Sequence, residues 1–200
     1  EQKMCGKNWA DIDPKNVPAV AAKKHRNGFR NVDKKGDQRS DDPDRIECAV
    51  HFEEAIEKAI DTGEGIKATV AGAHGIVKPY IYDAAKDMML EAQWKVLVKE
   101  AIDAFAAGGG IGKALALVDV SASMEGTPME VAVALGLLVA ELGDGQWKDL
   151  VLTFESNPQF FKVVGETLYE RVRHLKSAPW GGSTNFAKAI NMILAQAMKY

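Results

Sequence analysis

An apolar run that leads into a carboxylate and two hydroxyls limits the possible folds of this chain more than any other segment. Residues 114–118 read Ala-Leu-Ala-Leu-Val, and Asp119, Ser121 and Ser123 follow at every second position. The run is too short to cross a membrane, so we expect a buried strand of a parallel sheet. Ligands bind outside the carboxyl ends of strands in open α/β sheets. A carboxylate and two hydroxyls placed there predict a site for a hard cation.

The alternative is that Asp-x-Ser-x-Ser, a common pattern, only caps the next helix. Thr127 offers another N-cap, because a proline follows it and Glu130 stands three residues later, as in a capping box. A largely apolar helical segment then continues to about residue 142. With Thr127 as the cap, Ser121 and Ser123 remain available for a ligand.

The same segment carries a family resemblance. The string Asp-Val-Ser-Ala-Ser-Met, followed by Gly-Thr-Pro-Met-Glu-Val, resembles a von Willebrand factor A (vWA) domain. More narrowly, the chain resembles an uncharacterised family of plant and giant-virus proteins with a helical N-terminal region and a vWA-like carboxyl-terminal half. The string is also similar to that of the Ro (TROVE) RNA-binding autoantigen family. In these relatives the motif is the first part of a metal-ion-dependent adhesion site (MIDAS), which implies a metal site at Asp119, Ser121 and Ser123.

A second motif lies near the carboxyl end. Residues 181–185 read Gly-Gly-Ser-Thr-Asn and precede a helical pattern that continues to about residue 198. The glycines allow close backbone approach, and a hydroxyl is offered just before the helix. Such a loop is the second adhesion-site motif of the resembled family, in which Thr184 takes the position of the metal-ligand threonine. The third motif, an aspartate after the next strand, is missing before Tyr200, so we expect a fragment whose metal binding is weaker than that of a full domain.

The segments between the two motifs predict a small sheet. Residues 150–154 and 159–164 read as short strands, and the Asn-Pro turn between them favours antiparallel pairing. A polar helix is expected over residues 166–176. The predicted fold class is therefore α/β: a Rossmann-like vWA sheet with flanking helices, incomplete at its C-terminus and preceded by an α-helical subdomain.

The domain prediction divides the chain at a glycine-rich segment. Residues 1–107 form a helical N-terminal region, with helical periodicity over 17–24, 44–61 and 80–105 and a mobile loop at about 31–44. Residues 108–113 are read as a flexible linker and not as a phosphate loop, because Ala107 and Ala114 stand where a phosphate loop needs Gly and Ser or Thr. Residues 114–200 form the N-terminal part of the vWA-like domain.

Composition and charge exclude several classes of protein. At 46% hydrophobic and 26% charged residues, the chain is typical of a globular protein without a membrane span. Its net charge of −3 argues against binding nucleic acid through bulk positive charge. The densest basic cluster, at residues 23–30, is read as a solvated helix face, with contact to RNA or an acidic partner as the alternative. Two cysteines make no disulfide framework and favour an intracellular location, in the cytoplasm or in an organelle after removal of a targeting segment.

No catalytic constellation emerges, so we expect a protein that is not an enzyme. A phosphoaspartate enzyme would need a second acid at position 121, and neither Ser121 nor Ser123 lies in a Gly-x-Ser-x-Gly elbow. The predicted function is a metal-dependent protein-interaction module that binds Mg2+, with Mn2+ or Ca2+ as alternatives, and recognises Asp or Glu on a protein partner. The other hypotheses are a Ro-like RNA-binding protein and a structural subunit of a large assembly.

Overall fold

The computed structural model describes residues 2–69, 72–108, 114–119, 121–179, 181, 183 and 185–198. These residues are mostly helical and contain a three-stranded mixed sheet, which confirms the α/β class. They divide into two compact units: an N-terminal unit of Glu1–Gly72 with Asp87–Glu100, and a sheet unit of Ala73–Lys86 with Ala101–Tyr200. In the ranges described, none of the helices combines the length and the apolar character that crossing a membrane requires.

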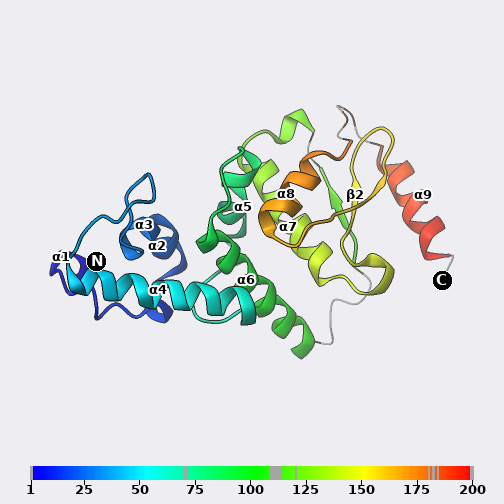
Figure 1. The fold of residues 1–200 in the computed structure, drawn as a ribbon. Helices are drawn as coiled ribbons and strands as arrows, with labels where there is room; N and C mark the ends of the chain where they lie inside the picture. Colours follow the sequence, from blue (N-terminus) through cyan, green and yellow to red (C-terminus); the bar gives the residue numbers. More distant parts are fainter. Residues whose placement is uncertain are drawn as a thin grey trace. The chain divides into compact units, whose positions relative to one another are not determined.

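The N-terminal unit is built from helices (Figure 1). Its elements are α1 (Gln2–Cys5), the 3-10 helix η1 (Pro14–Asn16), α2 (Ala19–Lys24), α3 (Arg26–Phe29), α4 (Pro43–Thr62) and most of α6 (Met88–Ala107). The helices predicted over residues 17–24 and 44–61 are thereby confirmed as α2 and α4.

Helix α4 forms because its ends are capped and one of its faces is apolar. The Asp42 side chain accepts a hydrogen bond from the Asp44 N–H at 3.0 Å, and Pro43 occupies the first turn. The buried residues of α4 recur at helical spacing: Cys48, Phe52, Ile56 and Ala59. The Phe52 ring stacks on that of Phe29, with ring centroids 4.4 Å apart, so α4 holds α3 against the core of this unit.

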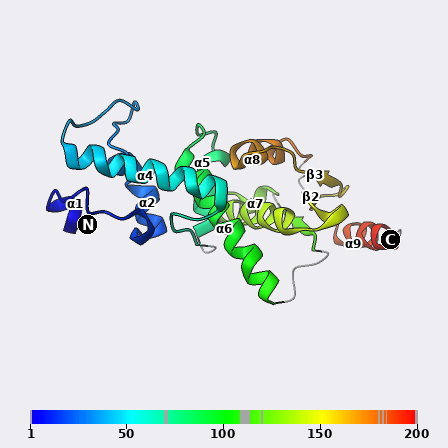
Figure 2. The same ribbon diagram turned by 60° about the horizontal axis from the view of Figure 1, so that its bottom comes forward.

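The sheet unit places three strands between helices. Its elements are α5 (Ala73–Ile81), the end of α6, β1 (Ala116–Val118), the 3-10 helix η3 (Ala122–Met124), α7 (Thr127–Leu142), the 3-10 helix η4 (Gly145–Trp147), β2 (Leu150–Thr153), β3 (Phe160–Lys162), α8 (Leu168–Lys176) and α9 (Phe186–Ala197). Strand β1 pairs with β2 in parallel, and β2 pairs with β3 antiparallel, both as predicted. Figures 1 and 2 both show α9 on the side of the strands away from α7 and α8.

Helix α7 lies directly on β1 at Gly136. A Cβ added at Gly136 would stand 2.5 Å from Cγ2 of Val118, which is closer than two such atoms can approach. Val118 is 2% exposed and is the last residue of β1. The absence of a side chain at Gly136 therefore lets the helix pack on the strand immediately before Asp119.

The helix predicted over residues 80–105 is wrong in one respect, because the segment is two helices. Helix α5 ends at Ile81, and α6 begins at Met88. Between them Asp83 adopts a left-handed conformation with φ of 61°, and the Asp87 carboxylate accepts a hydrogen bond from the Met89 N–H at 3.0 Å. The apolar periodicity therefore continues across a break in the helix, which is marked by the left-handed Asp83 and the side-chain hydrogen bond of Asp87.

The capping box predicted at Thr127 and Glu130 is also wrong. Gly126 is the N-cap of α7, and it makes no side-chain capping bond. Glu130 is 1% exposed and forms an ion pair with Lys78 of α5, its Oε1 lying 2.8 Å from Nζ. Packing of α7 on α5 draws this carboxylate inward, where Lys78 compensates its charge.

The compact units divide at places other than the predicted linker. Residues 109–113 lie outside the described residues, so the linker over 108–113 stays a prediction. Residues 73–86, which the sequence grouped with the helical N-terminal region, lie in the sheet unit. The Tyr80 ring meets that of Tyr169 edge-on at 5.4 Å, which ties α5 to α8 as Lys78 ties it to α7.

Candidate functional site

The first motif loop turns sharply at the carboxyl end of β1. Asp119 comes directly after the strand and is half-buried; its Oδ1 accepts a hydrogen bond from the Ser121 N–H at 2.9 Å. The Ser121 carbonyl accepts from the Met124 N–H at 2.8 Å, which closes η3. The Asp119 carboxylate thus holds the loop in the conformation that sets the direction of Ser121.

The two serine hydroxyls of this loop meet. Oγ of Ser121 lies 2.9 Å from Oγ of Ser123, and either atom can donate. Ser121 is buried at 9% exposure, whereas Ser123 is exposed. Because Ser123 is the exposed member of the pair, a ligand can approach the two hydroxyls from solvent on the Ser123 side.

A fourth oxygen-bearing side chain, Glu155, lies past the end of β2. Val118 pairs with Thr153 in the parallel register, so the residues after these strands leave the sheet at the same edge. Glu155 is 9% exposed, and its Oε1 accepts a hydrogen bond from Oγ1 of the fully buried Thr153 at 3.4 Å. This places a second carboxylate at the edge that bears Asp119.

The second motif loop lies against Glu155. The Asn185 N–H donates to the Glu155 carbonyl at 3.1 Å, and a Cβ at Gly181 would stand 2.7 Å from Oε2 of Glu155. Gly181 therefore permits the loop to reach the carboxylate. Oγ of Ser183 lies 2.5 Å from Oγ of Ser156, which fixes the loop a second time.

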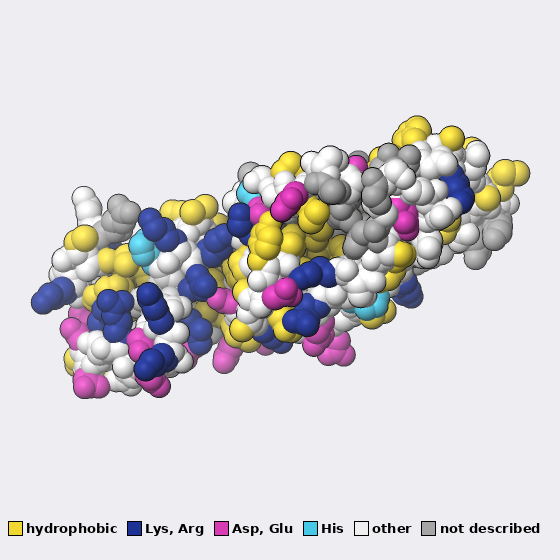
Figure 3. All heavy atoms as spheres, turned by 90° about the horizontal axis from the view of Figure 1, so that it is seen from above, with side chains coloured by type: hydrophobic (Ala, Val, Ile, Leu, Met, Phe, Trp, Pro, Cys, Tyr) yellow, Lys and Arg dark blue, Asp and Glu magenta, His cyan; other side chains and the backbone are white. Residues whose placement is uncertain are grey.

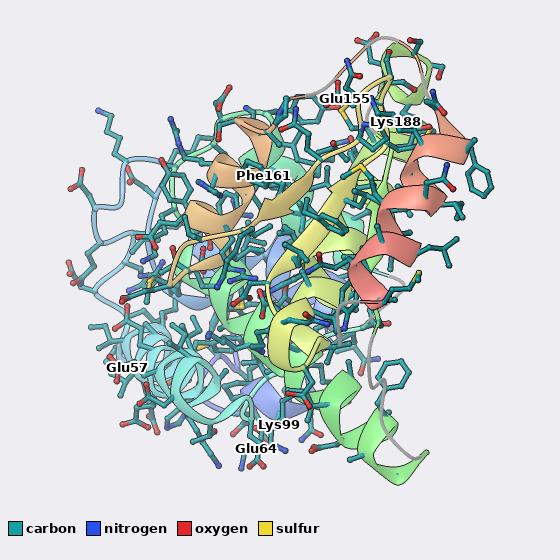
Figure 4. All side chains as sticks on the ribbon, turned by 90° about the vertical axis from the view of Figure 1, so that its right-hand side faces the viewer. Glu57, Glu64, Lys99, Glu155, Phe161 and Lys188 are labelled. Carbon is teal, nitrogen blue, oxygen red and sulfur yellow. The ribbon has the colours of Figure 1, made fainter. Side chains whose placement is uncertain are left out.

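Helix α9 begins at this same end of the sheet. The Asn185 side chain accepts a hydrogen bond from the Lys188 N–H at 2.9 Å and caps the helix, while Lys188 Nζ donates to Oδ1 of Asn157 at 2.6 Å. Figure 4 shows Glu155 and Lys188 at one end of the sheet, where α9 starts. The second motif loop and the start of α9 are thus held to the loop after β2 at Glu155, Ser156 and Asn157.

Of the four predicted metal ligands, the structure brings the Ser121 and Ser123 hydroxyls into contact. The Asp119 carboxylate accepts a hydrogen bond from the Ser121 N–H. Thr184 lies outside the described residues, although its neighbours Ser183 and Asn185 are held against the loop after β2. Convergence of all four side chains therefore stays a prediction.

Glu155 was not among the predicted site residues. A signal was available, because Glu155 is an acidic residue directly beyond a predicted buried strand, as Asp119 is. Its burial against Gly181 depends on a contact between segments that are far apart in sequence.

The described side chains of the two motif loops and the loop after β2 offer hard oxygen donors. Within the described residues, no group of three or more His, Cys, Asp and Glu side chains is placed to hold a metal ion. The hydroxyls of Ser121 and Ser123 and the carboxylates of Asp119 and Glu155 are oxygen donors, the type that suits Mg2+, Mn2+ and Ca2+.

Comparison with known proteins gives two matches. A family described as "Domain of unknown function (DUF7788)" matches residues 113–200, the segment that carries both motif loops. "Uncharacterized protein L728" of Acanthamoeba polyphaga mimivirus is 31% identical over 198 residues, which are 99% of this chain and 34% of that protein. The chain thus spans about a third of the length of this relative. No solved structure matches this chain.

These matches agree with the resemblance to giant-virus proteins of unknown function. Neither is a vWA or a Ro protein by its description. The vWA identity therefore rests on the motif residues and remains a proposal.

Proposed function

We propose that this chain is a non-catalytic, metal-dependent protein-interaction module of the vWA type, with Asp119, Ser121, Ser123 and Thr184 at its metal site. The observation that carries the proposal is the 2.9 Å separation of the Ser121 and Ser123 hydroxyl oxygens. Two adjacent ligands of an octahedral Mg2+, bonded at about 2.0–2.1 Å, lie about 2.9 Å apart. The hydroxyls therefore stand at the separation that a shared ion requires.

The surrounding residues have distinct tasks in this proposal. Ser121 and Ser123 would bind the ion directly. The Asp119 carboxylate would orient Ser121 by accepting a hydrogen bond from the Ser121 N–H, as it does in the structure. Glu155 supplies a second negative charge at the edge of the sheet. A Mg2+ ion ligated mainly by neutral hydroxyls retains a net positive charge, which favours an Asp or Glu carboxylate from a partner as a further ligand.

Metal binding is tested by replacing both hydroxyls. Mn2+ binding, followed by electron paramagnetic resonance, should weaken by about tenfold or more in the Ser121→Ala/Ser123→Ala double variant, because two ligands are removed. Ser177→Ala is the matched control, since that hydroxyl bonds the His174 carbonyl at the end of α8. Circular dichroism should show both variants folded. Equal Mn2+ affinity in the wild type and the double variant would remove the basis of the proposal.

Partner recognition needs a separate experiment. A pull-down with the chain as bait is made in Mg2+ and in excess chelator, and each arm is repeated after nuclease treatment. A protein partner that is released by chelator and retained after nuclease supports the interaction module. Release by nuclease would favour the Ro-like RNA-binding hypothesis instead, and retention in both treatments would favour a structural subunit.

A further inference from the structure

A hollow of about 690 Å3 in the N-terminal unit gathers positive charge. Its lining comes from α1, the α2–α3 segment, the loop before α4 and the first turn of α4. It includes five cations with one carboxylate: Lys24, Arg26, Lys34, Arg39, Arg45 and Asp33. Figure 3 shows Lys and Arg side chains gathered on this N-terminal part of the chain, beside a histidine. The concentration is local, because the whole chain carries a net charge of −3.

Few ion pairs balance this charge in the described part of the chain. Oδ1 of Asp33 already accepts hydrogen bonds from the N–H groups of Lys35 and Asp37, at 2.7 and 3.0 Å. Arg26 is paired with Asp87 at 2.5 Å. The other four cations, at positions 24, 34, 39 and 45, form no ion pair with any described residue.

Arg45 is held in position before any ligand arrives. Its Nε donates to Oδ1 of Asn31 and its Nη2 donates to the Gly28 carbonyl, each at 3.2 Å. Its guanidinium lies 4.3 Å from the centroid of the Trp9 ring. Burial, and then the neighbouring charge of Arg39, lowers the pKa of Arg45, while Cys48 and Asp42 oppose the shift.

We propose that this hollow binds a compact polyphosphate, either inorganic or the phosphate chain of a nucleotide. Its volume falls within the range of small-molecule sites, about 300–1,000 Å3. Several cations around one hollow match adjacent phosphate groups, and the planar fork of arginine suits phosphate oxygens. A nucleic-acid backbone would instead call for a groove that tracks the strand over several nucleotides.

The test uses the whole chain in metal-free buffer with EDTA, which makes it independent of the proposed metal site. Calorimetry at low ionic strength measures binding of inorganic tripolyphosphate, of ATP and of a single-stranded RNA decamer. Tripolyphosphate should bind, with an affinity that falls as NaCl is added. ATP that binds more tightly than tripolyphosphate assigns the site to nucleotides, and equal affinity assigns it to the phosphate chain alone.

The variants remove charge from exposed side chains, so folding is preserved. Lys34→Gln/Arg39→Gln should weaken tripolyphosphate binding about tenfold, because two lining cations are lost. Lys15→Gln/Lys67→Gln is the matched control: both lysines are exposed on the same unit and lie outside the lining of the hollow, and it should bind as the wild type does. The proposal is overturned if tripolyphosphate does not bind, if both double variants bind it equally, or if RNA alone binds.

Discussion

Cys48 illustrates how burial sets the chemistry of a single residue. Its side chain is fully buried in the core of the N-terminal unit, and burial raises the pKa of the thiol to about 11, while Arg45 opposes the shift. Because only the thiolate reacts, Cys48 should resist a disulfide reagent at pH 8 in the folded chain, whereas exposed Cys5 reacts at once. Counting modified thiols with and without denaturant measures this. Rapid modification of two thiols without denaturant would contradict the assigned burial.

The same pKa difference makes stability depend on pH. The folded pKa lies above the value of about 8.5 for a free thiol, so the unfolded chain loses this proton first as pH rises. The contribution that the protonated Cys48 thiol makes to the free energy of unfolding is therefore fully present below about pH 8.5. It is lost as the pH rises to about 11. Cys48→Ala is the control, because its urea midpoint should fall less steeply over that interval.

At the scale of elements, the ion pair of Lys78 and Glu130 joins α5 to α7. Glu130 is almost fully buried and Lys78 is half-exposed, so removing the lysine leaves an unpaired buried carboxylate. Lys78→Met should lower the free energy of unfolding, which is measured as a lower midpoint of urea denaturation.

The double variant Lys78→Met/Glu130→Gln tests whether the destabilisation comes from the unpaired Glu130 carboxylate and not from loss of the lysine itself. It should recover part of the stability, because the buried charge is gone. Lys162→Met, at an exposed position of β3, should leave the midpoint unchanged. If Lys78→Met were no more destabilising than Lys162→Met, the buried pair would not contribute as described.

At the scale of the whole molecule, the sequence predicts a cleavage site and the structure predicts the fate of the two fragments. Limited proteolysis should cut first within residues 108–113, where the composition is rich in glycine, and not within α7. The cut leaves α5 on one fragment and α7 with α8 on the other. Because Lys78 and Tyr80 bind α5 to these helices, the fragments should co-elute in native gel filtration and separate only in denaturant.

Two results would contradict this organisation. A first cut inside α7 would mean that its buried face opens more readily than the glycine-rich segment. Fragments that separate in native buffer would mean that α5 is not held in the sheet unit as the structure places it. Mass spectrometry of the fragments distinguishes the two cases.

The sequence by itself determined the elements whose signals are local. Apolar runs predicted β1, β2 and β3, and the Asn-Pro turn predicted the antiparallel pairing of β2 with β3. Helical periodicity predicted α2, α4, α7, α8 and α9. The loop after β1 could also be predicted as a cluster of oxygen donors, because Asp119, Ser121 and Ser123 are neighbours in the chain. These signals are readable because each depends on residues only a few positions apart.

Only the tertiary structure decided which distant residues meet. Glu130 fits a capping box in the sequence, yet it pairs with Lys78 because α5 packs on α7. Glu155 becomes part of the candidate site because parallel pairing brings the ends of β1 and β2 to one edge and Gly181 lets a later loop approach. Burial and charge compensation depend on contacts between segments far apart in the chain, and local sequence patterns do not encode those contacts.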